Sequence, residues 1–158
     1  MTLKSANIPG GLSRPALVAP PGTCDCHMHV IYPERRFPFI PGKEGVFPEH
    51  SCTAYRAVAE CLGVERCVIV LPPFYDFDNA SALLALREMG LPARAVVNVG
   101  PDVTDAELEA LDKAGARGAN FFMLPGGCLD WDALKLVAEK VHTLGWHVQI
   151  QLDGRLLG

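Results

Sequence analysis

The stretch Thr23-Cys24-Asp25-Cys26-His27-Met28-His29-Val30 is the part of this 158-residue chain around which the rest is organised. Its pattern predicts a strand, in which residues two apart leave the same face. His27 and His29 are therefore expected on one face with Asp25 one pleat deeper, and Cys24 and Cys26 on the other. Two imidazoles at the exit of a strand can hold a divalent metal ion or polarise a carbonyl group. The spacing is also met in plain surface pairs of histidines, so by itself it leaves both interpretations open.

Composition and charge exclude several classes of function. The length of 158 residues fits one domain with a real core, and 49% hydrophobic with 20% charged residues is typical of a soluble globular protein. A net charge of −4 provides no basic surface for nucleic acid and no polybasic patch for a membrane. The six cysteines are interpreted as reduced thiols, and we expect a cytoplasmic protein. We therefore expect no nucleic acid and no membrane as partners.

Two segments lack the periodicity of a helix or strand. Residues 1–22 are expected to form a flexible leader, because prolines and glycines interrupt every apolar run in them. The domain then spans residues 23–158. Residues 31–49 form a long loop rich in proline and aromatic residues, and long loops inside compact domains are commonly functional. Its aromatic side chains are expected either to wall a pocket or to pack onto the rim of the fold.

Downstream, strand patterns alternate with helix patterns. The apolar, β-branched run Arg66–Leu71 is typical of a strand buried on both faces, as in a parallel sheet. Helix ends are marked by capping residues, among them the pair Thr104 and Glu107 of a capping box. The expected strands are 23–30, 66–71, 93–99, 117–123 and 146–152, and the expected helices are 51–62, 79–89, 104–115 and 130–144. Such alternation predicts right-handed βαβ units and a parallel sheet.

Two α/β architectures fit this order. One is an open, doubly wound sheet of the flavodoxin kind. No Gly-x-Gly-x-x-Gly follows the first strand, which argues against dinucleotide binding. In that architecture the histidine pair also has no partners. The other is part of a (β/α)8 barrel, a fold that takes about 250 residues when complete. We favour the barrel, with strands 1–5 of 8 present and all parallel.

The ordered motifs resemble those of one superfamily. Asp25–Val30 is similar to the first-strand His-x-His motif of the amidohydrolase superfamily. Further along, the stretches 62–70, 78–79, 115–118, 124–127 and 145–154 resemble its lactonase branch, to which 2-pyrone-4,6-dicarboxylate lactonase and D-galactarolactone isomerase belong. The resemblance covers nearly the whole chain from Cys24 to Leu157. It implies the N-terminal part of a TIM-like barrel, with the site at the carboxyl ends of the strands.

This resemblance implies hydrolysis or isomerisation of the lactone ring of a sugar acid or a related carboxylic acid. His27 and His29 are the expected catalytic residues beside the lactone carbonyl, and also the expected metal ligands. The cofactor is one divalent metal ion, zinc or manganese, or there is none. Asn120, Gln151 and Tyr75 are the expected substrate contacts.

Two departures from the family pattern bear on the substrate. Asn120 stands where the dicarboxylate lactonase has an arginine, and Gln151 where it has a tyrosine. Bidentate recognition of a carboxylate by arginine is therefore not supported, which favours a hydroxylated, sugar-like lactone. A histidine on a sixth strand and an aspartate on an eighth, both implied by the resemblance, would lie beyond these five strands.

The alternative is that the chain is no enzyme. Five strands of an eight-stranded barrel leave an open sheet edge, and such edges tend to pair with another chain. We therefore expect a fragment that is incomplete or inactive by itself, and a homodimer through the open edge. A truncated or ligand-binding α/β module without catalysis is the second interpretation, which binding of a lactone without turnover would indicate.

Overall fold

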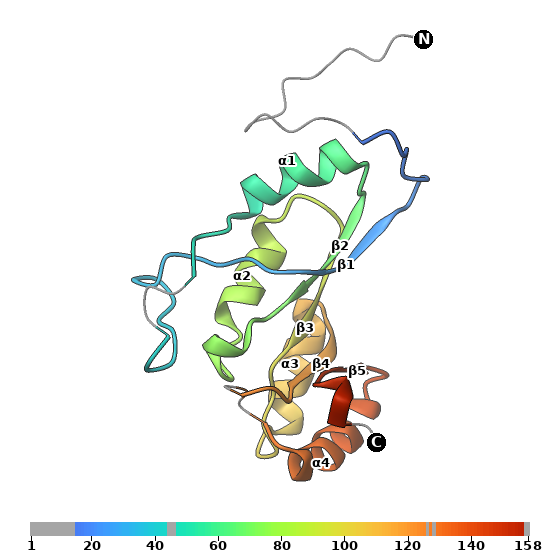
Figure 1. The fold of residues 1–158 in the computed structure, drawn as a ribbon. Helices are drawn as coiled ribbons and strands as arrows, with labels where there is room; N and C mark the ends of the chain where they lie inside the picture. The colour runs from blue at the N-terminus through green and yellow to red at the C-terminus, as the bar shows by residue number, and fades with distance from the viewer. Residues whose placement is uncertain (1–14, 44–46, 126, 128, 157–158) are drawn as a thin grey trace.

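The structure is a computed structural model that describes residues 15–43, 47–125, 127 and 129–156. Within these residues, five strands alternate with four α-helices and two short 3-10 turns (Figure 1). In chain order they are β1 (Cys24–Met28), α1 (Cys52–Leu62), β2 (Arg66–Val70), η1 (Pro73–Tyr75), α2 (Ala80–Glu88), β3 (Ala93–Val97), α3 (Asp105–Ala114), β4 (Ala116–Phe122), α4 (Trp131–His142), β5 (His147–Gln151) and η2 (Gly154–Leu156).

The five strands form one sheet in the order β1-β2-β3-β4-β5, and every neighbouring pair is parallel. This confirms the predicted parallel α/β architecture. The sheet is curled. Its first and last strands, β1 and β5, come close enough for their side chains to line the same pocket. The strands thus form part of a barrel wall whose carboxyl ends open onto one rim, which is where barrel enzymes place their sites.

Local signals account for the helix ends. The side chain of Ser51 accepts a hydrogen bond from the Ala54 amide, and Gly63 ends α1 in the left-handed conformation at φ 77°. The capping box predicted before α3 is present. At α2 the prediction was one residue early, since the helix begins at Ala80, whose amide donates to the side chain of Asp78.

The core lies between the sheet and the helices. Against α1 and α2, the sheet contributes Met28, Cys67 and Ile69, all buried. Against α3 and α4 it contributes Val97 and Phe121, neither of which is exposed to solvent. These side chains share one face of the sheet, so the opposite face, toward the inside of the curl, is left for the polar residues of the site.

A β-bulge in β1 corrects the placement predicted for Asp25. Asp25 pairs with Cys67 and Met28 with Ile69, so three steps along β1 match two along β2. The extra residue breaks the strict alternation of side chains. Asp25 consequently accepts a hydrogen bond from the Tyr55 hydroxyl of α1 at 2.9 Å, on the helix side of the sheet. The prediction that it shares the histidine face was wrong.

The predicted leader lies mostly outside the described residues, which begin at residue 15. Its last residue is tied to the second strand, because the Gly22 carbonyl accepts from the Arg66 guanidinium at 2.6 Å. The Gly22 amide also donates to the Glu65 carboxylate at 2.8 Å. Among the described helices, none has the length and apolarity that a bilayer span requires.

Candidate active site

His27 and His29 lie together at the carboxyl end of β1. Their ring centroids are 5.0 Å apart and the rings are nearly perpendicular. Both line a pocket of about 260 Å³ on the inner side of the curled sheet. Its other lining residues come from the ends of β2, β4 and β5 and from the loops around them: Ile31, Phe47, Val70, Pro72, Pro73, Phe74, Asn120, Phe122 and Gln151. The sequence prediction that the two histidines share a face is confirmed.

A backbone contact determines the tautomer of His29. Its Nδ1 lies 2.8 Å from the carbonyl oxygen of Val70 on β2. A carbonyl oxygen only accepts hydrogen bonds, so Nδ1 must carry the hydrogen. In the neutral ring, Nε2 then carries a lone pair and no hydrogen. It can accept a proton or bind a metal ion, but it cannot donate a hydrogen bond to a substrate carbonyl.

The surroundings of His27 favour its neutral form. Burial lowers the pKa of His27, the neighbouring His29 lowers this pKa further, and the Asp25 carboxylate acts in the opposite direction. The main chain at this point is anchored, since the His27 amide donates to Asp25 Oδ1 at 3.0 Å. A neutral imidazole has one N–H donor and one acceptor, so His27 can donate a hydrogen bond near neutral pH.

The structure brings two of the three predicted substrate contacts to this pocket. Asn120 lies in the middle of β4 rather than at its end, and its side chain is buried yet lines the pocket. Gln151 is the last residue of β5 and is exposed at the pocket rim.

Tyr75 is placed differently. It lies in η1, is buried to 3% exposure and packs against the rings of Phe39 and Phe74. It is not among the residues that line the histidine pocket, so its role as a substrate contact stays a prediction. Its ring instead supports Phe74, which does line the pocket.

The loop of residues 31–49 serves both of the purposes considered from the sequence. Phe47 lines the pocket and stacks on Phe74 with ring centroids 4.3 Å apart. Phe39 and Tyr32 are buried in the packing beneath. The aromatic residues of this loop therefore divide between lining the pocket, as Phe47 does, and packing beneath it, as Tyr32 and Phe39 do.

Sequence reasoning missed Gln149 as a site residue. Gln149 and Gln151 leave the same face of β5, and with His27 and His29 they line a wider opening of about 490 Å³ beside the pocket. The signal was present in the sequence, because two glutamines spaced by two on a strand must share a face. Two inward-facing amides on one strand indicate a binding surface.

The described residues do not complete a metal site by themselves. Among them, no group of three or more His, Cys, Asp or Glu side chains is placed to hold a metal ion. His27 and His29 supply two imidazoles, whereas catalytic zinc sites usually have three protein ligands. Further ligands would have to come from outside the described part of the chain.

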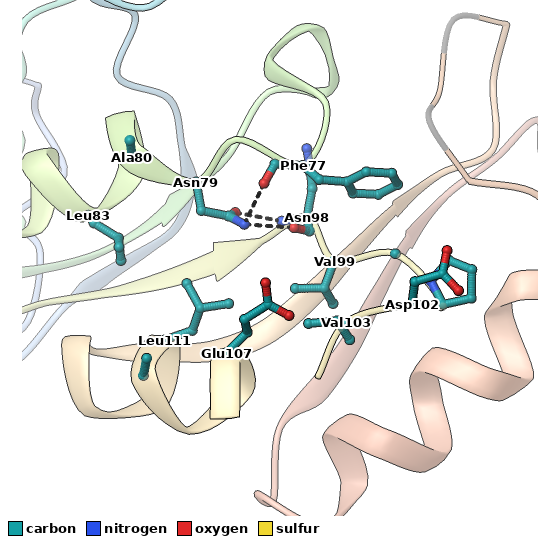
Figure 2. Close-up of a pocket in the computed structure, with 13 residues that line it drawn as sticks. Phe77, Asn79, Ala80, Leu83, Asn98, Val99, Asp102, Val103, Glu107 and Leu111 are labelled. Carbon is teal, nitrogen blue, oxygen red and sulfur yellow. Dashed lines mark hydrogen bonds between the residues drawn. The ribbon is translucent and has the colours of Figure 1, made fainter. Parts of the chain in front are cut away.

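A second pocket, of about 570 Å³, lies on the helix side of the sheet between α2 and α3 (Figure 2). Its walls are mostly apolar, with Leu83, Val99 and Leu111 among them. The carboxylate of Glu107 at its edge is already bound in the capping box of α3. Among the described residues, its ionisable lining groups are Asp102 and Glu107, and no histidine or cysteine lines it.

Comparison with known proteins identifies the family. The family model described as amidohydrolase matches residues 24–156. The chain is 34% identical over 137 residues to D-galactarolactone isomerase of Agrobacterium fabrum, covering 85% of this chain and 46% of the relative. It is 33% identical over 144 residues to 2-pyrone-4,6-dicarboxylate hydrolase of Comamonas testosteroni, covering 89% and 47%. It is 32% identical over 136 residues to 4-sulfomuconolactone hydrolase of Hydrogenophaga intermedia, covering 84% and 45%.

Solved structures agree with the sequence relatives. An apo crystal structure from Agrobacterium tumefaciens superposes with a TM-score of 0.79 at 33% identity, over 89% of this chain and 51% of that one. A probable 2-pyrone-4,6-dicarboxylic acid hydrolase from Acinetobacter baumannii has the same fold, with a TM-score of 0.71 at 21% identity over 86% and 51%. The chain spans about half the length of the curated relatives that it matches. These findings confirm the predicted partial barrel, and the chain belongs to the amidohydrolase family.

Proposed function

We propose that this chain carries the N-terminal half of the site of an enzyme that opens or isomerises the lactone ring of a sugar acid or a related carboxylic acid. The observation that carries the proposal is the pair of imidazoles at the end of β1, facing Asn120 and Gln151 across one pocket. The names of three relatives support it, because each specifies a lactone or a pyrone, which is a cyclic ester.

The two histidines have different chemical roles in this proposal. His27 donates its N–H to the lactone carbonyl oxygen, where negative charge develops during attack. His29 Nε2 accepts the proton of the attacking oxygen, because its Nδ1 hydrogen is held by Val70. The new bond forms between that oxygen and the carbonyl carbon, the ring C–O bond breaks, and the ring oxygen takes up a proton. Water as nucleophile gives hydrolysis, and a substrate hydroxyl gives isomerisation.

A divalent metal ion, zinc or manganese, is the cofactor that the family implies. His27 and His29 would be its ligands from this chain, and the tautomer of His29 leaves Nε2 available for one. Because the described residues offer only these two, the steps above are derived without a metal.

The proposal is tested by incubating the purified chain with D-galactarolactone and, separately, with 4-sulfomuconolactone, and following binding and products by proton NMR. Because the chain supplies half of the site, we expect one lactone to bind with little or no turnover, and we expect this binding to be lost in His27→Asn and His29→Asn. His147→Asn is the matched control, because His147 lies at the opposite end of β5 from Gln151. Absence of binding by both lactones would contradict the proposal, and full turnover by the chain alone would contradict the statement that it carries only half of the site.

A homodimer through a sheet edge remains part of the proposal. β1 and β5 are the edge strands of the described sheet, and Ile150 on β5 is 41% exposed. Light scattering after size exclusion is expected to show a dimer that Ile150→Lys converts to a monomer, because a charge on an edge strand opposes pairing. A wild-type monomer would contradict it.

A further inference from the structure

Three side-chain amides form a chain across the inner face of the sheet. Gln149 Nε2 on β5 donates to Asn120 Oδ1 on β4 at 3.3 Å. Asn120 Nδ2 donates to Asn98 Oδ1, which follows β3, also at 3.3 Å. Asn98 and Asn120 are the buried members, with exposed fractions of 1% and 4%. Buried amides of this kind are costly unless each is fully hydrogen-bonded, so the chain has to be ordered.

Asn98 is held at both its side chain and its main chain. Its Nδ2 donates to the carbonyl oxygens of Asp76 at 2.8 Å and Pro72 at 3.4 Å. Its backbone N–H and C=O are both bound by the side-chain amide of Asn79, at 3.0 and 2.8 Å (Figure 2). Asp76 has a φ of 50°, a conformation that residues other than glycine rarely adopt, so the bond from Asn98 also stabilises an unfavourable turn.

The direction of every bond in the chain follows from this anchor. The carbonyls of Pro72 and Asp76 can only accept, so the nitrogen of Asn98 must face them and its oxygen must face Asn120. Asn120 must then present its nitrogen to Asn98 and its oxygen to Gln149. Hydrogen-bond chemistry alone therefore sets the orientation of each of these amides.

Counting bonds shows what Asn120 can still offer a ligand. An amide nitrogen has two hydrogens, and those of Asn120 go to Asn98 and to the Leu71 carbonyl at 3.4 Å. Its oxygen has two lone pairs, of which Gln149 uses one. One acceptor position is all that remains. Among the described residues, no arginine or lysine lines this pocket or the wider opening beside it, so neither contains a cation for a carboxylate.

We propose that Asn98 is a positioning residue that fixes Asn120 as a hydrogen-bond acceptor, so that the pocket selects lactones with a hydroxyl donor at this position over lactones with a carboxylate there. The inference rests on the proposed lactone-processing function and names the substrate class of the same site. A hydroxyl donates to the free lone pair of Asn120, whereas a carboxylate would place two acceptors against it.

The test compares two probes on the 15N-labelled chain by NMR titration. D-galactono-1,4-lactone has hydroxyls and no carboxylate, and 2-pyrone-4,6-dicarboxylate has carboxylates and no hydroxyl. We expect the hydroxylated probe to bind at least about 10-fold more tightly, as for one hydrogen bond gained against one acceptor left unpaired. Equal binding, or a preference for the dicarboxylate, would overturn the inference alone. If neither probe binds, both the inference and the proposed function are overturned.

Variants separate positioning from stability. Asn98→Leu removes the acceptor that orients Asn120, so the preference between the probes is expected to fall toward 1. Asn98→Asp keeps an acceptor for Asn120 and is expected to retain the preference while melting at a lower temperature. Asn79→Ala is the control, because Asn79 binds the main chain of Asn98 and not its side-chain amide. An unchanged preference in folded Asn98→Leu would overturn the inference.

A measurement on the unmodified chain remains decisive if the variants fail to fold. The side-chain NH2 groups of Asn98 and Asn120 are each expected to exchange hydrogen at least about 10-fold more slowly than that of the exposed Gln151, because both hydrogens of each are bound inside the protein. Exchange of the Asn120 amide as fast as that of Gln151 would show that its hydrogens are free, and would overturn the inference.

Discussion

The two faces of the sheet use the same strands in opposite ways. On the helix side, Ile69, Val97 and Phe121 pack with apolar residues of the helices. On the pocket side, polar side chains form hydrogen bonds between strands: His29 with Val70, Asn120 with Asn98, and Gln149 with Asn120. The helix side depends on apolar area, which tolerates adjustment, and the pocket side on directed hydrogen bonds, which do not. Stability and the proposed selectivity thus depend on neighbouring residues of one strand.

Phe121 and Phe122, consecutive on β4, test this division most directly. Phe121 has no exposed surface and lies in the helix-side core, whereas Phe122 lines the histidine pocket. Phe121→Ala is expected to lower the free energy of unfolding by about 3–5 kcal/mol through lost burial and a cavity. Phe122→Ala is expected to cost less than about 2 kcal/mol, because its ring is only partly buried. Urea unfolding measures both, and equal losses would contradict the division.

Gly118 on β4 sharpens the comparison at the other end of the pocket side. A Cβ added there would lie 2.6 Å from Cε1 of His147 on the adjacent strand. Gly118→Ala is therefore expected to destabilise by about 1–2 kcal/mol, toward the lower end for overpacking because His147 is exposed and can shift. Thermal unfolding checks it. In a His147→Ala background, Gly118→Ala is expected to lower the stability by close to nothing. An undiminished loss of stability would show that the contact with His147 is not the reason for the glycine.

The smallest expected effect is the dependence of stability on pH through His27. Burial and the neighbouring His29 lower the pKa of His27 below its ordinary value near 6.5. The unfolded chain then binds more protons than the folded one below about pH 6.5, so this contribution to stability is lost as the pH falls through that value. Urea unfolding at about pH 7.5 and about pH 5.5 measures the loss, which His27→Asn is expected to reduce. His142→Asn, on the exposed side of α4, is the control, and an identical loss in wild type and His27→Asn would contradict the assignment.

Several features of the site depended on information that local sequence patterns do not contain. The bulge that turns Asp25 toward Tyr55 arises from how β1 pairs with β2, and a strict count of two along β1 cannot show it. Tyr75 packs against Phe39 of the loop, a long-range contact that local sequence does not show, and its role as a substrate contact stays a prediction. The spacing of Gln149 from Gln151, by contrast, is a signal that the local sequence does contain.

The sequence by itself determined the alternation of strands and helices, the helix caps, the family and the pairing of His27 with His29 at one strand end. These features depend on motifs or on contacts within a few residues, so they can be predicted from local sequence patterns. Only the tertiary structure decided that Asn98, Asn120 and Gln149 form one chain, and that Val70 sets the tautomer of His29. The physical reason is that both depend on the register between strands, which long-range pairing settles and local sequence does not.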